Sequence, residues 1–443
     1  MKVAFHTLGC KVNQYETEAM MKDFRQRGYE IVDERDYADV YIINTCTVTA
    51  VADRKSRQYI RRMKSVNPDS VVAVTGCYAQ IKPEEVAAVE GVDIVAGTNE
   101  KSHIAEYIAD FFEDHVPQVH IRGYEELDAY EETGTVASTE NRTRAYIKIQ
   151  EGCNRFCSYC VIPYARGKVR SRGLDEIVEE AEQLIDAGYK ELVLTGINTA
   201  LYDMENGRDG GDGIYGVEKV IAALDAIDGD FRIRLSSLEP AVVNAEYVSR
   251  LLKYDKLCHH MHLSAQSGSD AVLEAMNRPY SRQDYTDIVR VLREFDPYYG
   301  ISTDIIVGFP GEKEKYFDES CSLVRECSFC RTHIFKYSKR PLTKAAGMDG
   351  QIDPEVRNRR SDKLHSIGAR SAEDFFRKNA GRTEIVLLEE IYPEKRIATG
   401  YTDNYTRVYI EYDDEQEISR LLNEFVGVKL LEPFEEGMTA KLL

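Results

Sequence analysis

Two series of alternating strand and helix patterns limit the folds that this chain of 443 residues can adopt. In the first series, short apolar runs that read as strands fall at 2–8, 39–45, 70–76 and 93–97. Helical patterns lie between and after them, near 14–28, 49–66 and 83–90. Because strand–helix alternation is typical of a parallel sheet with helices on both faces, we expect an N-terminal doubly wound parallel-sheet domain over residues 1–121.

The second series begins at Ala145, after a polar and acidic segment, residues 122–144, that reads as a linker. Its six candidate strands lie at 146–150, 190–196, 231–237, 260–266, 301–309 and 331–338. Helical patterns separate these strands, near 174–187, 217–227, 242–253, 282–295 and 314–326. Six strand–helix units predict a partial, open (β/α)6 barrel of the TIM type over residues 145–353, with its chemistry at the carboxyl ends of the strands. The glycine-rich stretch 205–216 is expected to form a loop beside that face.

The last ninety residues change character twice. Residues 354–380 carry a mixed-charge helical pattern that ends at Ala380-Gly381, a typical helix C-cap, and we expect a helical connector there. Residues 381–443 read as short strands joined by turns, which predicts a small C-terminal β-barrel. The fold class is therefore α/β with an appended β-barrel.

Composition narrows the classes of function. No run approaches the roughly 18 to 20 apolar residues that a membrane span needs, and the N-terminus lacks a secretory apolar region, so we expect a cytoplasmic protein with no membrane partner. The formal net charge of −19 argues against a surface that binds nucleic acid everywhere, but it leaves room for local basic patches. Ten cysteines in a reducing compartment are expected to be metal ligands or core residues rather than disulfides.

Three of these cysteines, Cys153, Cys157 and Cys160, form a C-x3-C-x2-C array directly after the first expected barrel strand. A zinc site would need a fourth ligand, which the loop lacks and only a distant residue could supply. An iron–sulfur cube held by three thiolates instead leaves one iron open for a cofactor or substrate. We therefore expect a [4Fe–4S] cluster here, with zinc as the alternative.

Another three cysteines follow strands of the first series, at Cys10, Cys46 and Cys77. Because the carboxyl ends of parallel strands lie along one edge of the sheet, these thiols are expected to converge on a shared metal site. The remaining four cysteines are expected to be small buried hydrophobes: Cys258, Cys321, Cys327 and Cys330.

The array with an aromatic residue before its third cysteine resembles the radical S-adenosylmethionine superfamily. Over essentially the whole chain, the Cys10–Cys46–Cys77 set and seven ordered segments resemble the methylthiotransferase family: LGCKVNQYET, EGCNRFCSYCVIPYARG, LTGIN, SSLEP, HLSAQSGS, VGFPGE and FKYSKRPLTKA. Within that family, KVNQ and GYTDNY look most like the branch that acts on tRNA N6-threonylcarbamoyladenosine, at adenosine 37 beside the anticodon. Two sister branches, acting on isopentenyladenosine in tRNA and on an aspartate of a ribosomal protein, stay open as alternatives.

The resemblance implies two [4Fe–4S] clusters and S-adenosyl-L-methionine. The cluster on Cys153, Cys157 and Cys160 would bind that cofactor, and a second cluster on the other cysteine set would carry the sulfur. One molecule of the cofactor would donate the methyl group and another would supply the radical that removes the hydrogen from C2. An external electron donor and a sulfur donor are implied as partners, and residues 381–443 would be a TRAM domain, a small RNA-binding barrel.

Cofactor contacts are implied for five further residues, which lie in the cysteine loop and at strand ends. An aromatic side chain at Tyr159 would pack against the adenine of the cofactor. Gly196 and Asn198 would lie by its methionine amino group, and Glu239 and Gln266 by its sulfonium or ribose. Ordinary capping of strand ends is the alternative for Glu239 and Gln266, and the sequence singles out no catalytic residue beyond the cluster and cofactor site.

RNA contacts are expected from cations in three places: Arg54, Arg57 and Arg61; Arg166 and Lys168; and Arg407. Arg166 or Lys168 could instead meet the threonylcarbamoyl carboxylate, and simple solvation is the alternative for every patch. The C-terminal barrel is an awkward RNA binder, since residues 381–443 hold seven Lys or Arg against fourteen Asp or Glu. Either its cations cluster around GYTDNYTRV, or RNA binding relies on the first two domains. A non-catalytic iron–sulfur RNA-binding protein is the alternative of another class.

Overall fold

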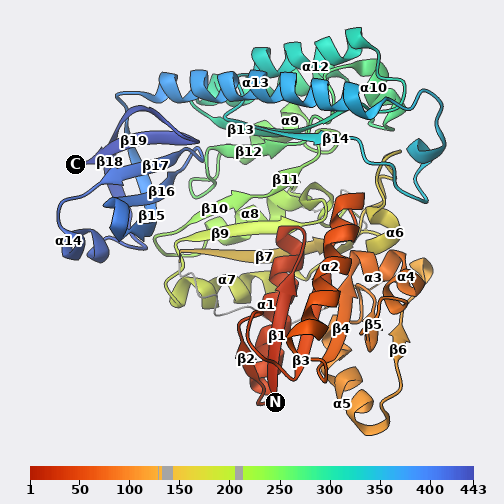
Figure 1. Cartoon of the computed structure of the whole chain (residues 1–443). Coiled ribbons are helices and arrows are strands. Elements are labelled where there is room, and N and C mark those ends of the chain that lie inside the picture. The colour runs from red at the N-terminus through yellow and green to blue at the C-terminus, as the bar shows by residue number, and fades with distance from the viewer. Residues whose placement is uncertain (128, 132–142, 205–212) are drawn as a thin grey trace.

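The computed structural model describes residues 1–127, 129–131, 143–204 and 213–443. Three α/β or β units follow one another along the chain, and a long helix spans the second unit on its way to the third (Figure 1). Most of the expected linker and of the glycine-rich loop lies outside the described residues. Within the described part, no helix is long and apolar enough to cross a membrane.

The N-terminal unit is a six-stranded parallel sheet in the order β2-β1-β3-β4-β5-β6. Its strands are β1 (Lys2–Thr7), β2 (Glu30–Val32), β3 (Val40–Thr45), β4 (Val71–Gly76), β5 (Ile94–Ala96) and β6 (Gln118–His120). Its helices are α1 (Lys11–Gln26), α2 (Ala50–Val66), α3 (Cys77–Ile81), α4 (Pro83–Ala87) and α5 (Ile104–Asp114). One apolar cluster joins the sheet to α1 and α5, and another joins it to α2, α3 and α4, so the expected doubly wound domain is confirmed.

The second unit is an open barrel of parallel strands, as expected. The strands are β7 (Arg144–Glu151), β9 (Glu191–Gly196), β10 (Arg232–Leu235), β11 (Ser237–Leu238), β12 (His260–Leu263), β13 (Gly300–Val307) and β14 (Arg331–Lys336). The third expected strand breaks into β10 and β11, which gives two sheets, β10-β9-β7-β8 and β11-β12-β13-β14, with β8 (Arg170–Ser171) antiparallel to β7. Helices cover the outside: α7 (Leu174–Asp186), α8 (Val217–Asp225), α9 (Ala245–Leu251), α10 (Asp270–Ala275), α11 (Arg282–Phe295) and α12 (Glu314–Cys327).

The two faces of the barrel sheets differ sharply in polarity. Residues such as Ile147, Leu192 and Ile301 alternate along the strands and pack with the covering helices in one apolar core. The side chains between them face the interior, since successive residues of a strand point to opposite faces. These inner positions hold mainly polar residues: Arg144, Tyr146, Lys148, Glu191, Arg234, His260, His262, Ser302, Asp304 and His333. A TIM-barrel interior is usually packed with branched apolar side chains. The polar interior of this barrel instead suits a polar cofactor or substrate.

The third unit is a closed barrel in the order β15-β16-β17-β19-β18, which follows α13 (Pro354–Asn379). Its elements are β15 (Thr383–Tyr392), β16 (Ile397–Thr402), β17 (Arg407–Glu411), α14 (Glu415–Arg420), β18 (Phe425–Phe434) and β19 (Gly437–Leu442). The turn after β16 docks at the amino ends of the barrel strands, where Asn404 Nδ2 donates to the Tyr298 carbonyl at 3.0 Å. Gly300 permits this contact, because a Cβ there would lie 2.0 Å from the Asn404 carbonyl oxygen. The third unit thus closes the end of the barrel opposite its carboxyl-terminal face.

Candidate active site

The cysteine array lies in the loop that leaves β7, at the carboxyl end of the barrel strands. Gly152 starts the loop with a φ of +71°, and a Cβ there would lie 1.8 Å from the Lys168 carbonyl oxygen. Ser158 ties the loop to α10 and the residue after it, since its backbone N–H donates to Met276 and its hydroxyl to Ala275. The pKa of Cys153 is raised to about 11 and that of Cys160 to about 12, in both cases mainly by burial and in part by the charge of Cys157. The three thiols therefore lie in one desolvated group, as the sequence predicts.

The second set of cysteines gathers where β1, β3 and β4 end. Cys10 precedes α1, Cys46 follows β3 and Cys77 opens α3. Gly9 brings the first loop close to the second, because a Cβ on it would lie 2.9 Å from the Cys46 Cβ. The pKa of Cys46 is raised to about 12, first by burial and then by Cys77, and the pKa of Cys77 is raised by burial and by Cys10. These three thiols also form one electrostatic group.

Each set offers three thiols, which is the ligand number of a [4Fe–4S] cube with one open iron. Among the described residues, no three His, Cys, Asp or Glu side chains lie close enough to share one metal ion. A [4Fe–4S] cube needs no such closeness, because each thiolate binds a different iron. Since burial raises the pKa of the five other thiols besides Cys10, binding of iron to them would release protons.

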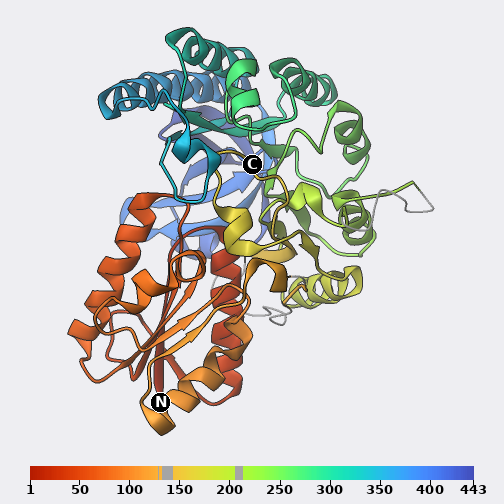
Figure 2. The same ribbon diagram turned by 90° about the vertical axis from the view of Figure 1, so that its right-hand side faces the viewer.

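A cavity of about 230 Å³ lies between the N-terminal domain and the barrel. Val48 and Thr49, which follow Cys46 by two and three residues, line it from one side, and Cys160 lines it from the other. The barrel contributes Gln266 from the end of β12, Asp304 from β13 and Phe335 from β14. In Figure 2 the segment after β7, with α6 (Ile162–Arg166), lies between the N-terminal domain and the barrel helices. The barrel set thus borders this cavity directly through Cys160, and the N-terminal set is linked to it by the segment that follows Cys46.

Asn198 and Glu239 belong to a polar cluster beside the cysteine loop. Glu239 accepts from Asn198 Nδ2 at 2.7 Å, from Arg155 Nε at 2.9 Å and from Arg278 Nη1 at 2.8 Å. The Asn198 Oδ1 atom is buried and has no hydrogen-bond partner among the described residues. An open buried acceptor suits an ammonium group, so this site fits the amino end of S-adenosylmethionine. Gly196 lets the chain pass Gln150, because a Cβ there would lie 3.0 Å from its carbonyl oxygen.

Tyr159 and Gln266 both line the cavity. The Tyr159 hydroxyl accepts from Arg278 Nη2 at 2.9 Å, and burial holds its pKa well above the usual range. Gln266 adopts a left-handed φ of +64°, a strained conformation for a residue other than glycine that is common at functional sites. Arg278 joins Tyr159 to Glu239 through its two Nη atoms. It lies in the segment after α10, where no local sequence pattern marks it as a site residue.

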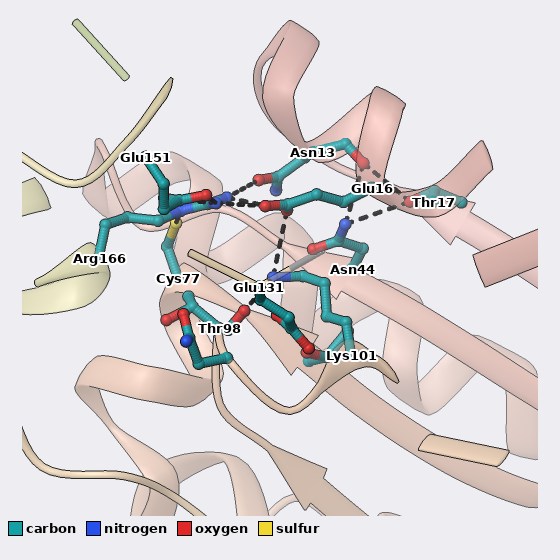
Figure 3. A network of polar contacts seen from close by, with 12 residues as sticks. Asn13, Glu16, Thr17, Asn44, Cys77, Thr98, Lys101, Glu131, Glu151 and Arg166 are labelled. Atoms are coloured by element: carbon teal, nitrogen blue, oxygen red, sulfur yellow. Dashed lines mark hydrogen bonds and ion pairs between the residues drawn. The ribbon is translucent and has the colours of Figure 1, made fainter. Parts of the chain in front are cut away.

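The expected role of Arg166 in contacting RNA or the threonylcarbamoyl group is wrong. Its side chain is 0% exposed, and it joins the two domains in the network of Figure 3. Nε donates to Cys77 Sγ at 3.2 Å, and Nη1 donates to Glu16 at 2.6 Å and to Glu151 at 3.0 Å. Burial alone would raise the pKa of the Glu16 carboxyl, but Arg166, Lys101 and Lys148 together hold it well below its usual range. Burial likewise opposes ionisation of Glu151, but the charges of Arg166 and Lys148 outweigh it and lower the pKa of that carboxyl.

The other cations expected to meet RNA lie at or near the surface. Arg54 and Arg61 are exposed on α2, while Arg57 pairs with Glu85 at 2.5 Å. Lys168 pairs with the exposed Glu125 at 2.6 Å, and Arg407 lies over the Tyr409 ring, 5.2 Å from its centroid. The GYTDNY turn, by contrast, is part of the contact with the barrel, so it offers no open basic face. The four other cysteines are buried, as expected.

Comparisons with known proteins match both α/β units. Residues 2–97 match the Uncharacterized protein family UPF0004, and residues 147–324 match the Radical SAM superfamily. The threonylcarbamoyladenosine tRNA methylthiotransferase MtaB of Bacillus subtilis (strain 168) is 42% identical over 448 residues, which cover 100% of this chain and 97% of that protein. The tRNA-2-methylthio-N(6)-dimethylallyladenosine synthase of Clostridium novyi (strain NT) is 35% identical, over 86% of this chain and 84% of that protein.

Among solved structures, the radical S-adenosylmethionine methyltransferase TsrM of Kitasatospora setae, with cobalamin and a [4Fe–4S] cluster bound, has a TM-score of 0.58. The two chains share 16% identity, and the match covers 78% of this chain and 77% of the other. At this identity the likeness bears on the fold alone.

Proposed function

Because this chain belongs to the threonylcarbamoyladenosine tRNA methylthiotransferase family of radical S-adenosylmethionine enzymes, we propose that it adds a methylthio group to C2 of N6-threonylcarbamoyladenosine in tRNA. The product is 2-methylthio-N6-threonylcarbamoyladenosine. The observation that carries the proposal is the cavity between the two domains, which Cys160 lines from one side and the residues after Cys46 line from the other, in a chain that matches such an enzyme over its full length.

Cys153, Cys157 and Cys160 would hold the cluster that binds S-adenosylmethionine. When bound, this pair of cofactors supplies the radical chemistry that an unreactive C–H carbon requires and that no side chain can supply. The protein orients the cofactor: Asn198 offers Oδ1 to its amino group, and Tyr159 borders the cavity where its adenine would pack. Glu239 positions Asn198 and Arg278 through the hydrogen bonds described above.

A second [4Fe–4S] cluster on Cys10, Cys46 and Cys77 is part of the proposal. Its support is the grouping of the three thiols at the ends of β1, β3 and β4, and the place of Val48 and Thr49, which follow Cys46, on the side of the cavity that faces Cys160. The Arg166 guanidinium donates to Cys77, and a hydrogen bond to a ligating sulfur is one of the features that set the potential of a cluster. The sulfur donor and the electron donor are external partners.

We place the target adenosine in the single-stranded anticodon loop, where a base leaves its stack at low cost to reach a buried site. Phosphate contacts would come from exposed cations such as Arg54 and Arg61 on α2, which begins beside the cavity-lining residues Val48 and Thr49. A tRNA substrate and ligands that need reduced thiols both point to the cytoplasm as the place of the reaction.

Anaerobic reconstitution with iron and sulfide tests the two-cluster arrangement. We expect about eight irons in the wild type and about four after either set of cysteines is changed to alanine, Cys10/Cys46/Cys77 or Cys153/Cys157/Cys160. The reconstituted wild type should methylthiolate tRNA that carries threonylcarbamoyladenosine, read by mass spectrometry, and leave ribosomal protein and isopentenyladenosine tRNA unchanged. About four irons in the wild type, falling to none in the Cys153/Cys157/Cys160 variant, would mean that Cys10, Cys46 and Cys77 hold no cluster, and would remove the sulfur-presenting site and with it the proposed function.

A further inference from the structure

The interior of the barrel carries an excess of positive charge near the amino ends of its strands. Arg144, Arg232 and Arg234 all reach the single carboxylate of Glu191, at 3.4, 2.6 and 2.8 Å. Arg144 has a further partner, Glu389, which the C-terminal barrel contributes at 2.5 Å. Three guanidinium groups therefore share two carboxylates, and this end of the interior attracts an anion.

Lys11 adds a further cation to the same space. It begins α1, whose amino-terminal end lies beside β7 and β9 (Figure 1), and its ammonium lies over the Tyr146 ring, 5.7 Å from the centroid. Tyr146 follows Arg144 by two residues on the inner face of β7, so the Lys11 ammonium lies on the side of the strand that carries the arginine. Lys11 is exposed to solvent, and no described residue gives it an ion pair or a hydrogen bond. Glu18 and Glu34 line the same cavity as Lys11 and Cys10, but no ion pair joins either carboxylate to Lys11 among the described residues.

The position of Lys11 matters because it directly follows Cys10. If the second cluster presents sulfur to C2 of the adenine, C2 must come close to this cysteine set. The substituent on N6 is attached to the ring carbon that is separated from C2 by a single ring nitrogen, so it leaves the ring near the same side. A threonylcarbamoyl group carries a carboxylate at its end, whereas an isopentenyl group carries no charge.

We propose that Lys11 binds the carboxylate of the threonylcarbamoyl group and so selects this substrate over an adenosine with an uncharged substituent. The inference rests on the proposed function and adds a specificity residue to it. The neighbouring arginines have partners in Glu191 and Glu389, so they raise the positive potential while Lys11 makes the contact. The Tyr146 ring lies under the ammonium group and restricts the positions that the Lys11 side chain can take.

The test compares RNAs that differ only at the carboxylate. Anticodon stem-loops carrying threonylcarbamoyladenosine, its threonyl methyl ester, or unmodified adenosine are titrated anaerobically against reconstituted protein, and Kd is measured. We expect the wild type to prefer the acid over the ester by roughly tenfold or more, because a hydrogen bond to a charged group is at stake. Lys11→Met should bind acid and ester equally, at the affinity the wild type has for the ester.

Controls separate this site from damage to the cluster beside it. Iron and sulfide are counted in every variant; Lys11→Arg keeps the charge and should keep the preference for the acid. Arg25→Met removes an exposed cation from the last turn of the same helix and should behave as the wild type. Equal binding of acid and ester by the wild type, or a preserved preference in Lys11→Met, would overturn the proposal.

Product formation in the same samples distinguishes the two proposals. A wild type that methylthiolates the threonylcarbamoyl RNA but binds acid and ester equally would refute the Lys11 site and leave the function standing. A wild type with full clusters that modifies none of the RNAs would refute the function itself.

Discussion

Replacing Arg166 with methionine tests whether one buried guanidinium holds the N-terminal domain against the barrel. Arg166 bonds to Glu16 of α1 and to Glu151 of β7, and all three side chains are at most 4% exposed. In the variant, Lys148 still reaches both carboxylates, at 2.8 and 2.5 Å, but two carboxylates then share fewer cations. Removing one partner of a buried ion pair costs about 3–5 kcal/mol, and with Lys148 remaining we expect about 3 kcal/mol.

That loss is large against the roughly 5–15 kcal/mol by which a domain is stable. It also depends on pH in a definite direction. Arg166 helps to hold the pKa of Glu16 and Glu151 below the unfolded value of 4.5, so both carboxylates stabilise the wild type above that pH. This contribution is lost as the pH falls from about 4.5 through the folded pKa values. The difference between wild type and variant should therefore be largest at pH 7 and shrink on acidification.

Urea unfolding followed by circular dichroism measures the difference, since the chain has no tryptophan. Arg54→Met, on the exposed face of α2, is the matched control and should change the free energy of unfolding by less than about 0.5 kcal/mol. Adding Glu151→Gln to Arg166→Met should recover part of the loss, because it removes an uncompensated buried charge. A difference below about 1 kcal/mol at pH 7, or one that grows on acidification, would refute the reasoning.

Three further substitutions probe other parts of the structure. Gly300→Ala places a Cβ against the Asn404 carbonyl and should destabilise docking of the C-terminal barrel by about 1–3 kcal/mol. We expect faster proteolysis of the chain after α13, and an unchanged rate would contradict the contact. Asn198→Ala should weaken binding of S-adenosylmethionine roughly tenfold in equilibrium dialysis at unchanged iron content, and unaltered binding would exclude Asn198 from the site. Glu191→Gln leaves three arginines without their shared carboxylate and should lower the free energy of unfolding, measured in urea, by about 3–5 kcal/mol. An unchanged free energy would mean that water already screens the three guanidinium charges.

The sequence predicts most of the strands because they are long, buried and apolar. β2 and β6 escape detection because they have three residues each and none of these is fully buried, whereas β5, which is equally short, is a buried apolar run. The third barrel strand appears as one run in the sequence, but Ser236 separates β10 from β11, and the sheet divides there. Local periodicity says which face of a strand is apolar; it does not say where pairing between strands is interrupted.

The cysteines of the site are predictable because their positions after strand ends place them on one edge. The charged residues between the domains are not. Glu16, Lys101 and Arg166 read as surface residues in sequence, since such side chains are almost never fully buried unless paired. Their partners lie up to 153 positions away, so no local pattern shows that Arg166 turns inward. GYTDNY likewise gives no sign that it packs against the end of another domain.

The buried arginine gives the two cysteine sets a defined separation. Arg166 follows Cys160 by six residues, and its guanidinium donates to Cys77 across the domain boundary. The loop that would hold one cluster is thus joined, through a short helix and one side chain, to a ligand of the other. Because reacting atoms must approach to roughly 3–3.5 Å, an error of an ångström in this separation would be felt in the chemistry. A charge network that costs much to desolvate is therefore placed where it fixes the distance on which transfer between the two sites depends.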